Sequence, residues 1–257
     1  MLPSAKKNIS PIHCGQVTPL LDLSADVLRF LDRKRDLNNY DIQEKILREC
    51  VEKYPGHDNY AAVEVKAKLL NLFYSTGIKA IDKVIEKIMS IDDIDSIFKM
   101  PMHYKKLVDS IAELNLNDGN KRTNYSFATK YCALHQPKKY PIYDSIVATI
   151  FTKLMVQGNL PPYIYNKGRT KNSKDFFLTK GEFMANLHDY DFFVNVYKTF
   201  MNDYGLDGMC YREVDLYLWG SYKDGSHESL IEKIVPLKEG KDYTIIKLKK
   251  AVKKIIT

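Results

Sequence analysis

The stretch that decides the fold of this chain is SFATKYCALHQPKKYPIYDSIV, residues 126–147. Its spacing predicts an apolar helix, a short turn marked by Pro137 and Pro141, and then a second helix. Asp144 comes just before the apolar run that begins at Ile146, at an N-cap position, where a carboxylate accepts backbone N–H groups. An acid held there can be a helix cap and nothing more, or it can stabilise a cation beside it.

Helical periodicity extends outward from this stretch over most of the chain, and turn-forming residues separate the periodic runs. The runs predict helices at residues 23–31, 40–54, 61–75, 78–89, 92–98, 104–116, 124–135, 144–157, 180–187, 191–204 and 211–219. Almost no alternating strand pattern precedes residue 240, and we find no fixed repeat that would indicate a solenoid. We therefore expect an all-α globular fold.

The composition limits the classes of function. The chain has 257 residues, 45% of them hydrophobic, which is enough for one large domain or two lobes. The net charge of +7 favours an anionic partner, nucleic acid first and a membrane surface second, although many mildly basic proteins bind nothing anionic. No apolar run is long enough for a membrane span, and residues 1–15 lack an apolar signal core. We expect a cytoplasmic protein with no membrane partner.

Candidate metal ligands are scattered along the chain. The four cysteines, Cys14, Cys50, Cys132 and Cys210, never approach the C-x-x-C spacing of zinc or iron–sulfur sites, and the six histidines form no paired motif. We expect free thiols, no metal and no cofactor.

Two basic segments could contact phosphates. Residues 157–180 form a long irregular stretch in which Tyr163 and Tyr165 precede Lys167 and Arg169, a mixture suited to base stacking and phosphate contact. Residues 238–257 hold seven lysines and form a basic C-terminal element. Either segment can instead be an ordinary solvated surface.

Two segments together resemble the helix–hairpin–helix DNA glycosylases, the superfamily of endonuclease III and the 8-oxoguanine glycosylases. The first is LLNLFYSTGIKAIDKVI, residues 69–85, which looks like the early helix pair of that family. The second is the opening stretch, in which Pro141-Ile-Tyr-Asp144 matches the connector that carries the catalytic aspartate, with Tyr143 as an extra residue. The resemblance implies one domain over residues 1–257 that divides into two helical lobes, with Asp144 at the cleft between them.

The resemblance also implies an activity. Members flip a modified base out of double-stranded DNA and break its N-glycosidic bond, and we expect this chain to act as a monomer. Asp144 would stabilise the positive charge that develops on the sugar. Members that also cleave the strand use a lysine on the preceding helix. The matching position by count is Ser126 or Tyr125, so we expect a hydrolytic enzyme that leaves an abasic site, with Lys130 as the alternative nucleophile.

The remaining site residues follow from the same resemblance. The family hairpin normally carries more than the single glycine found here, Gly119, but nearby side chains can still hold a phosphate. The expected DNA contacts are Lys121, Arg122 and Asn124 near the hairpin, Ser75 and Thr76 in the early helix-pair turn, and Lys167 and Arg169 in the long loop. The expected base-pocket residues are Tyr74, Tyr125, Ser126, Tyr143, Asp215 and Trp219.

The sequence does not identify the base that is removed. An oxidised or damaged base would imply DNA repair, and a bulky base such as glucosylated hydroxymethylcytosine in phage DNA would imply antiviral defence. The alternative from another class is a non-catalytic helical DNA-binding module in which Asp144 is only a cap.

Overall fold

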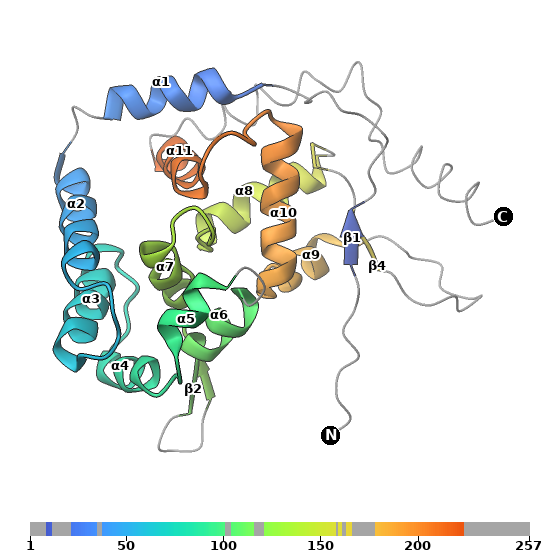
Figure 1. Cartoon of the computed structure of the whole chain (residues 1–257). Helices are drawn as coiled ribbons and strands as arrows, with labels where there is room; N and C mark the ends of the chain where they lie inside the picture. The colour runs from blue at the N-terminus through green and yellow to red at the C-terminus, as the bar shows by residue number, and fades with distance from the viewer. Residues whose placement is uncertain are drawn as a thin grey trace. The chain divides into compact units, whose positions relative to one another are not determined.

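The fold is all-α, as the periodicity predicts (Figure 1). The computed structural model describes residues 9–11, 22–34, 38–100, 104–115, 121–157, 159–160, 163–165 and 178–223. These residues form eleven helices: α1 Ser24–Lys34, α2 Asn38–Lys53, α3 Tyr60–Phe73, α4 Ile81–Met89, α5 Ile94–Lys99, α6 Tyr104–Ala112, α7 Tyr125–His135, α8 Ser145–Val156, α9 Lys180–Asn186, α10 Tyr190–Asp203 and α11 Tyr211–Lys223. Each of the eleven predicted helices overlaps one of them.

The helix predicted at residues 104–116 is wrong at its C-terminal end. Helix α6 stops at Ala112, and the chain continues as strand β2, Glu113–Asn115, which pairs antiparallel with β3, Lys121–Thr123. The turn-forming sequence between the two strands, Asn117-Asp118-Gly119, favours a β-hairpin over continued helix. A strand of three residues is too short to show a detectable alternating pattern, and the helical apolar pattern of α6 continues into it.

The stretch at 157–180, predicted as irregular, contains strand β4, Tyr163–Tyr165. It pairs antiparallel with β1, Ile9–Pro11. The two partners lie more than a hundred positions apart, so their pairing depends on tertiary structure that local sequence patterns do not encode. Residues 166–177 and the C-terminal element at 238–257 lie outside the described residues.

The chain divides into two compact units, each made of more than one segment. One unit contains residues 25–144 and 209–217, and we call it the central unit. In it α3 packs against α2 and α4, while α7 packs against α2, α3 and α6 (Figure 1). Eight of the eleven residues of α7 are buried, which explains why its apolar pattern is not confined to one face.

The other unit contains residues 1–24, 145–208 and 218–257. Its described core is rich in aromatic side chains from α8 and α10, among them Phe151, Phe193 and Phe200. The Tyr204 hydroxyl donates to the Asn159 carbonyl at 2.6 Å, and the Leu23 amide donates to the Tyr204 carbonyl at 2.9 Å. These bonds fix the end of α10 within its unit.

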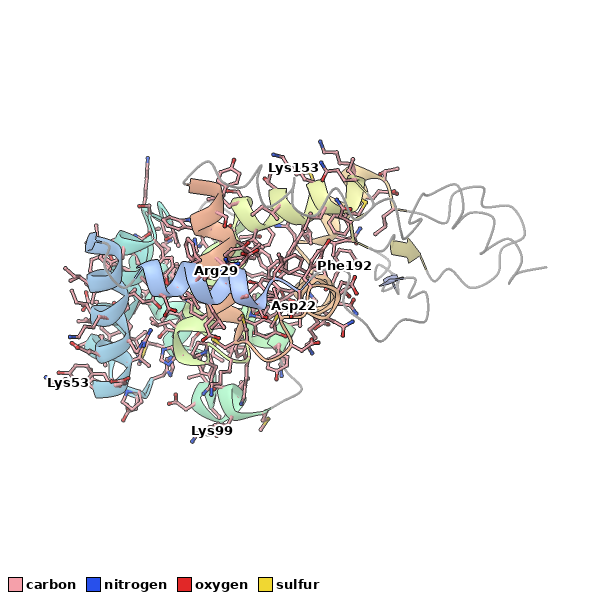
Figure 2. All side chains as sticks on the ribbon, turned by 90° about the horizontal axis from the view of Figure 1, so that it is seen from above. Asp22, Arg29, Lys53, Lys99, Lys153 and Phe192 are labelled. Atoms are coloured by element: carbon pink, nitrogen blue, oxygen red, sulfur yellow. The ribbon has the colours of Figure 1, made fainter. Side chains whose placement is uncertain are left out.

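Lys53 and Lys99, at the ends of α2 and α5, extend outward from their helices (Figure 2). None of the described helices combines the length and the apolar character needed to cross a membrane.

A histidine pair, of which His57 is buried and His135 half-buried, lies in the core of the central unit. The His57 and His135 rings are 4.6 Å apart, and both rings also stack near Phe98. His57 Nδ1 bonds to Asp95 Oδ1 at 2.6 Å, and the ammonium of the wholly buried Lys66 donates to the Tyr54 and Gly56 carbonyls at 3.0 and 2.8 Å. Neither histidine Nε2 has a hydrogen-bond partner among the described residues. The core therefore accepts these rings best when they are neutral.

We expect this histidine pair to make a contribution to stability that is lost as the pH drops from 7.5 to 5.5. Burial lowers the pKa of His57, and the hydrogen bond to Asp95 offsets only part of this shift. Burial also lowers the pKa of His135, well below the ordinary range. In the unfolded chain both rings take up a proton near pH ~6.5. The unfolded state then binds more protons, and each ring removes at most about 1.4 kcal/mol of stability per pH unit below that point.

Urea unfolding at several pH values measures this effect. The variant His135→Phe keeps the aromatic packing beside Phe98 and removes one titrating ring, so its stability should fall less steeply than that of the wild type. The control His188→Gln changes an exposed histidine and should keep the wild-type slope. Equal slopes for His135→Phe and the wild type would contradict this account.

Candidate active site

Asp144 ends the connector that joins α7 to α8, directly before the first residue of α8. The connector folds back onto α7 through Thr129, whose hydroxyl accepts the Tyr143 amide at 3.1 Å and is 3.4 Å from the Tyr143 carbonyl. The Tyr143 ring packs against Tyr125 with centroids 4.7 Å apart. A buried hydroxyl on α7 thus fixes Tyr143, the residue directly before Asp144, and through it the place of Asp144 relative to α7.

Lys130 comes from the same helix and is 8% exposed. It interacts electrostatically with both Asp144 and Asp215. Burial lowers the pKa of Lys130, and the two acidic neighbours offset only part of that effect. A lysine in such surroundings loses its proton more readily than an exposed one.

Arg212, on α11, connects three segments of the central unit. Its Nε and one terminal nitrogen grip the Glu44 carboxylate at 3.1 and 2.7 Å, and its other terminal nitrogen donates to Asp215 Oδ2 at 2.5 Å. The Tyr74 hydroxyl donates to the same Glu44 carboxylate at 2.8 Å. The guanidinium is well matched to this bidentate geometry. Although burial alone would raise it, the pKa of Glu44 is lowered by Arg212 and Tyr74.

Asp215, on α11, has the most unusual environment of these charged side chains. The residue is 4% exposed, Arg212 binds its Oδ2, and its Oδ1 has no hydrogen-bond partner among the described residues. Burial raises the pKa of Asp215 to about 7, with Asp144 and Glu44 acting in the same direction against Arg212 and Lys130. Asp215 therefore exchanges its proton near neutral pH.

Tyr74 lies against both cations of the cluster. The Lys130 ammonium is 5.4 Å and the Arg212 guanidinium carbon 5.5 Å from the centre of its ring. Both distances are within the range of a cation–π interaction. We call Glu44, Tyr74, Lys130, Asp144, Arg212 and Asp215 the acid–base cluster. All six residues belong to the central unit.

The turn after Tyr74 is held by the side chain of Asn71. Asn71 Oδ1 accepts the Thr76 hydroxyl at 2.6 Å and the Ile78 amide at 3.0 Å, and its amide nitrogen donates to the Ile78 carbonyl at 3.0 Å. Ser75 is exposed and has a φ of 48°, in the left-handed region. Of the two residues predicted here as DNA contacts, Thr76 thus supports the turn, and Ser75 is presented to solvent.

The structure brings four predicted site residues together: Tyr74, Lys130, Asp144 and Asp215. Tyr125 and Tyr143 pack against each other behind Asp144, and Ser126 uses its carbonyl to accept the Thr129 hydroxyl at 3.0 Å. Trp219 is on α11, but it falls in the other compact unit and is not part of the described cluster.

The predicted DNA contacts near the hairpin have mixed placements. Lys121 and Arg122 are on strand β3, and nothing further is described of their side chains. Asn124 is buried directly before α7, and its backbone N–H donates to the Ala112 carbonyl at 2.9 Å. Lys167 and Arg169 lie outside the described residues.

Two members of the cluster were missed by sequence reasoning, Glu44 and Arg212. Arg212 is three positions before Asp215 in a predicted helix, so the pair shares a face, and this spacing could have identified it. Glu44 offers no such signal because it lies 168 positions from Arg212. In the described part of the chain, no three His, Cys, Asp or Glu side chains are grouped as metal ligands would be.

The comparisons with known proteins cover only part of the chain. Residues 26–139 match the family model HI_0787_N, described as an N-terminal domain, and this range nearly coincides with the continuous segment of the central unit. An uncharacterized protein of Haemophilus influenzae is 40% identical over 80 residues, which are 31% of this chain and 38% of that protein. The match thus spans well under half the length of that relative. No solved structure matches the chain.

Proposed function

We propose that the protein is a DNA N-glycosylase, which flips a modified base out of double-stranded DNA and hydrolyses its bond to the sugar. The observation that supports this most strongly is the acid–base cluster. Its parts come from α2, the end of α3, α7, the connector and α11, and they include the acid expected at a helix start together with a buried lysine and a second acid. Perturbed acids and bases gathered in this way are typical of functional sites.

In this proposal Asp144 stabilises the transition state. Breaking a base–sugar bond leaves positive charge on C1′ and the ring oxygen, and a nearby carboxylate lowers the barrier. Asp144 is only partly exposed, and its position is fixed by the connector, so little reorganisation is needed when the charge develops. The same carboxylate can orient the water that attacks C1′.

The net charge of +7 supports duplex DNA as the partner, because cationic surfaces gain affinity by releasing the counterions of the phosphate backbone. Ser75 at the exposed turn, with Lys121 and Arg122 on the hairpin, are the proposed backbone contacts. Tyr74 is the proposed aromatic contact of the flipped base.

The test is a mass-spectrometric search for free bases released from double-stranded DNAs of different kinds. The set should include oxidised DNA and phage DNA that contains glucosylated hydroxymethylcytosine. We expect one modified base to appear in free form, with an abasic site left in the strand. Salt-dependent duplex binding without base release from any of these DNAs would instead support the alternative, a helical DNA-binding module.

A second candidate activity is a glycosylase that also cleaves the strand, with Lys130 as nucleophile. Its lowered pKa and its interaction with Asp144 favour this role, since an uncharged amine can attack C1′ and form a Schiff base. Under the hydrolytic proposal, borohydride should trap no enzyme–DNA adduct. An adduct that forms with the wild type and disappears in Lys130→Ala would assign the nucleophile to Lys130 and replace the hydrolytic mechanism.

A further inference from the structure

Asp215 is a carboxyl group whose two oxygens have different surroundings. Oδ2 accepts a short bond from Arg212, while the buried Oδ1 has no hydrogen-bond partner among the described residues. An ionised carboxylate has acceptor sites on both oxygens, and leaving one of them buried and unpaired is costly. A proton on Oδ1 lowers this cost, because it neutralises the group while Oδ2 continues to accept from Arg212, and an unpaired O–H donor costs less than an unpaired charge.

The charges around Asp215 favour the same state. The acid–base cluster contains two cations, Lys130 and Arg212, and two other acids, Glu44 and Asp144, all of which interact electrostatically with Asp215. These four charges balance when Asp215 is neutral. Ionising Asp215 adds an uncompensated negative charge in a buried place, which is unfavourable. The proton is therefore held by the surroundings of the carboxyl group and not by one contact.

The two aspartates of the cluster are thus placed for opposite tasks. Asp144 is partly exposed at the end of the connector, directly before α8, whereas Asp215 is buried. Enzymes that cleave glycosidic bonds use such a pair, in which one carboxyl group acts on the sugar and the other, kept protonated, acts on the leaving group. We propose that Asp215 is the general acid that protonates the departing base, an inference that rests on the proposed glycosylase function.

The step balances as a hydrolysis. As the C1′–N bond breaks, its electron pair moves to the base, and the Oδ1 proton passes to a nitrogen or oxygen of the base directly or through one water. Water adds its oxygen to C1′, and the proton that this water releases restores Asp215. Arg212 is the positioning residue, since its bond to Oδ2 leaves Oδ1 as the donor.

The experiment compares the pH dependence of base release in the wild type, Asp215→Asn and Glu213→Gln. The wild-type rate should fall as the pH rises above about 7, where Asp215 loses its proton. The rate for Asp215→Asn should be lower by about 100-fold at pH 6 and should not show this fall. Glu213 lies on the same helix, bonded to the Cys210 amide and outside the cluster, so Glu213→Gln should keep the wild-type profile.

Leaving-group dependence separates a proton donor from a merely structural acid. A base that leaves easily without protonation should be released almost equally by the wild type and Asp215→Asn, whereas a poor leaving group should show the full loss. A uniform loss for all bases, or an unchanged pH profile, would overturn the inference and leave the glycosylase function in place. Absence of base release by the wild type on every DNA would overturn both.

A measurement on the wild type keeps the test valid if Asp215→Asn does not fold. Carbon NMR of protein labelled at the aspartate carboxyl groups reports each titration without DNA. We expect one aspartate to titrate near pH 7. If every aspartate carboxyl carbon shows the shift of the ionised form at pH 5.5 and above, Asp215 holds no proton at the working pH, and the inference is wrong.

Discussion

Replacing Arg212 by Met is expected to lower the free energy of unfolding by about 3–5 kcal/mol. Methionine keeps the length and much of the packing of the side chain but removes the charge and every donor. Glu44, with 18% of its side chain exposed, then loses its bidentate partner and keeps only the Tyr74 hydroxyl and the exposed Arg48, and Asp215, with 5% exposed, loses the donor to its Oδ2. A buried charge without a partner is among the most destabilising changes that one substitution can make.

Arg48→Met provides a matched control, because Arg48 contacts the same Glu44 carboxylate from the surface. A terminal nitrogen of Arg48 lies 3.9 Å from Glu44 Oε1, and 67% of the Arg48 side chain is exposed. Exposed pairs of this kind contribute less than about 1 kcal/mol. Urea unfolding at pH 7.5 measures both variants. If Arg212→Met and Arg48→Met lost similar amounts of unfolding free energy, the buried bonds of Arg212 to Glu44 and Asp215 would contribute no more than an exposed ion pair.

Adding Glu44→Gln and Asp215→Asn to Arg212→Met tests the cause of the loss. If uncompensated charge destabilises the single variant, neutral amides in place of both acids should recover part of the stability. A triple variant less stable than Arg212→Met would mean that the loss comes from packing, because removing the charges would then bring no benefit.

The helices could be predicted from the sequence because each carries its own periodic apolar pattern. Tyr60–Phe73 and Tyr190–Asp203 are long, start at a capping residue and are rich in apolar side chains, so local information was sufficient. The short strands could not be predicted in this way. The end of α6 depends on a hairpin partner eight positions further on, and β1 depends on a partner in another part of the chain.

The acid–base cluster was only partly predictable. Asp144 and Lys130 lie close together in the sequence, on a helix and its connector, so their neighbourhood follows from local structure. Asp215 could be named as a candidate, but its burial, and the lack of a described hydrogen-bond partner for its Oδ1, depend on the side chains that α2, α7 and α11 bring together. Glu44 could not be named at all, because it enters the cluster only through Arg212. Tertiary contacts decide which charged residues become buried, and this decides their chemistry.

Replacing Asp144 by Asn is expected to lower the rate of base release by about 100- to 1,000-fold while leaving the fold intact. Asparagine has nearly the same shape and caps a helix as well as aspartate does, so the start of α8 should be preserved. What is lost is the negative charge that stabilises the sugar cation. Single-turnover release from the DNA that the wild type acts on measures the effect, and circular dichroism checks the helices.

Asp189→Asn separates the charge of an acid from its role as a cap. Asp189 is the N-cap of α10, accepts the Asp191 and Phe192 amides at 3.1 and 3.2 Å, and lies outside the acid–base cluster. Its variant should release base at the wild-type rate, and both variants should unfold within about 0.5 kcal/mol of the wild type, because asparagine caps a helix as well as aspartate does. If Asp144→Asn also released base at the wild-type rate, Asp144 would be a cap like Asp189, and the catalytic assignment would fail.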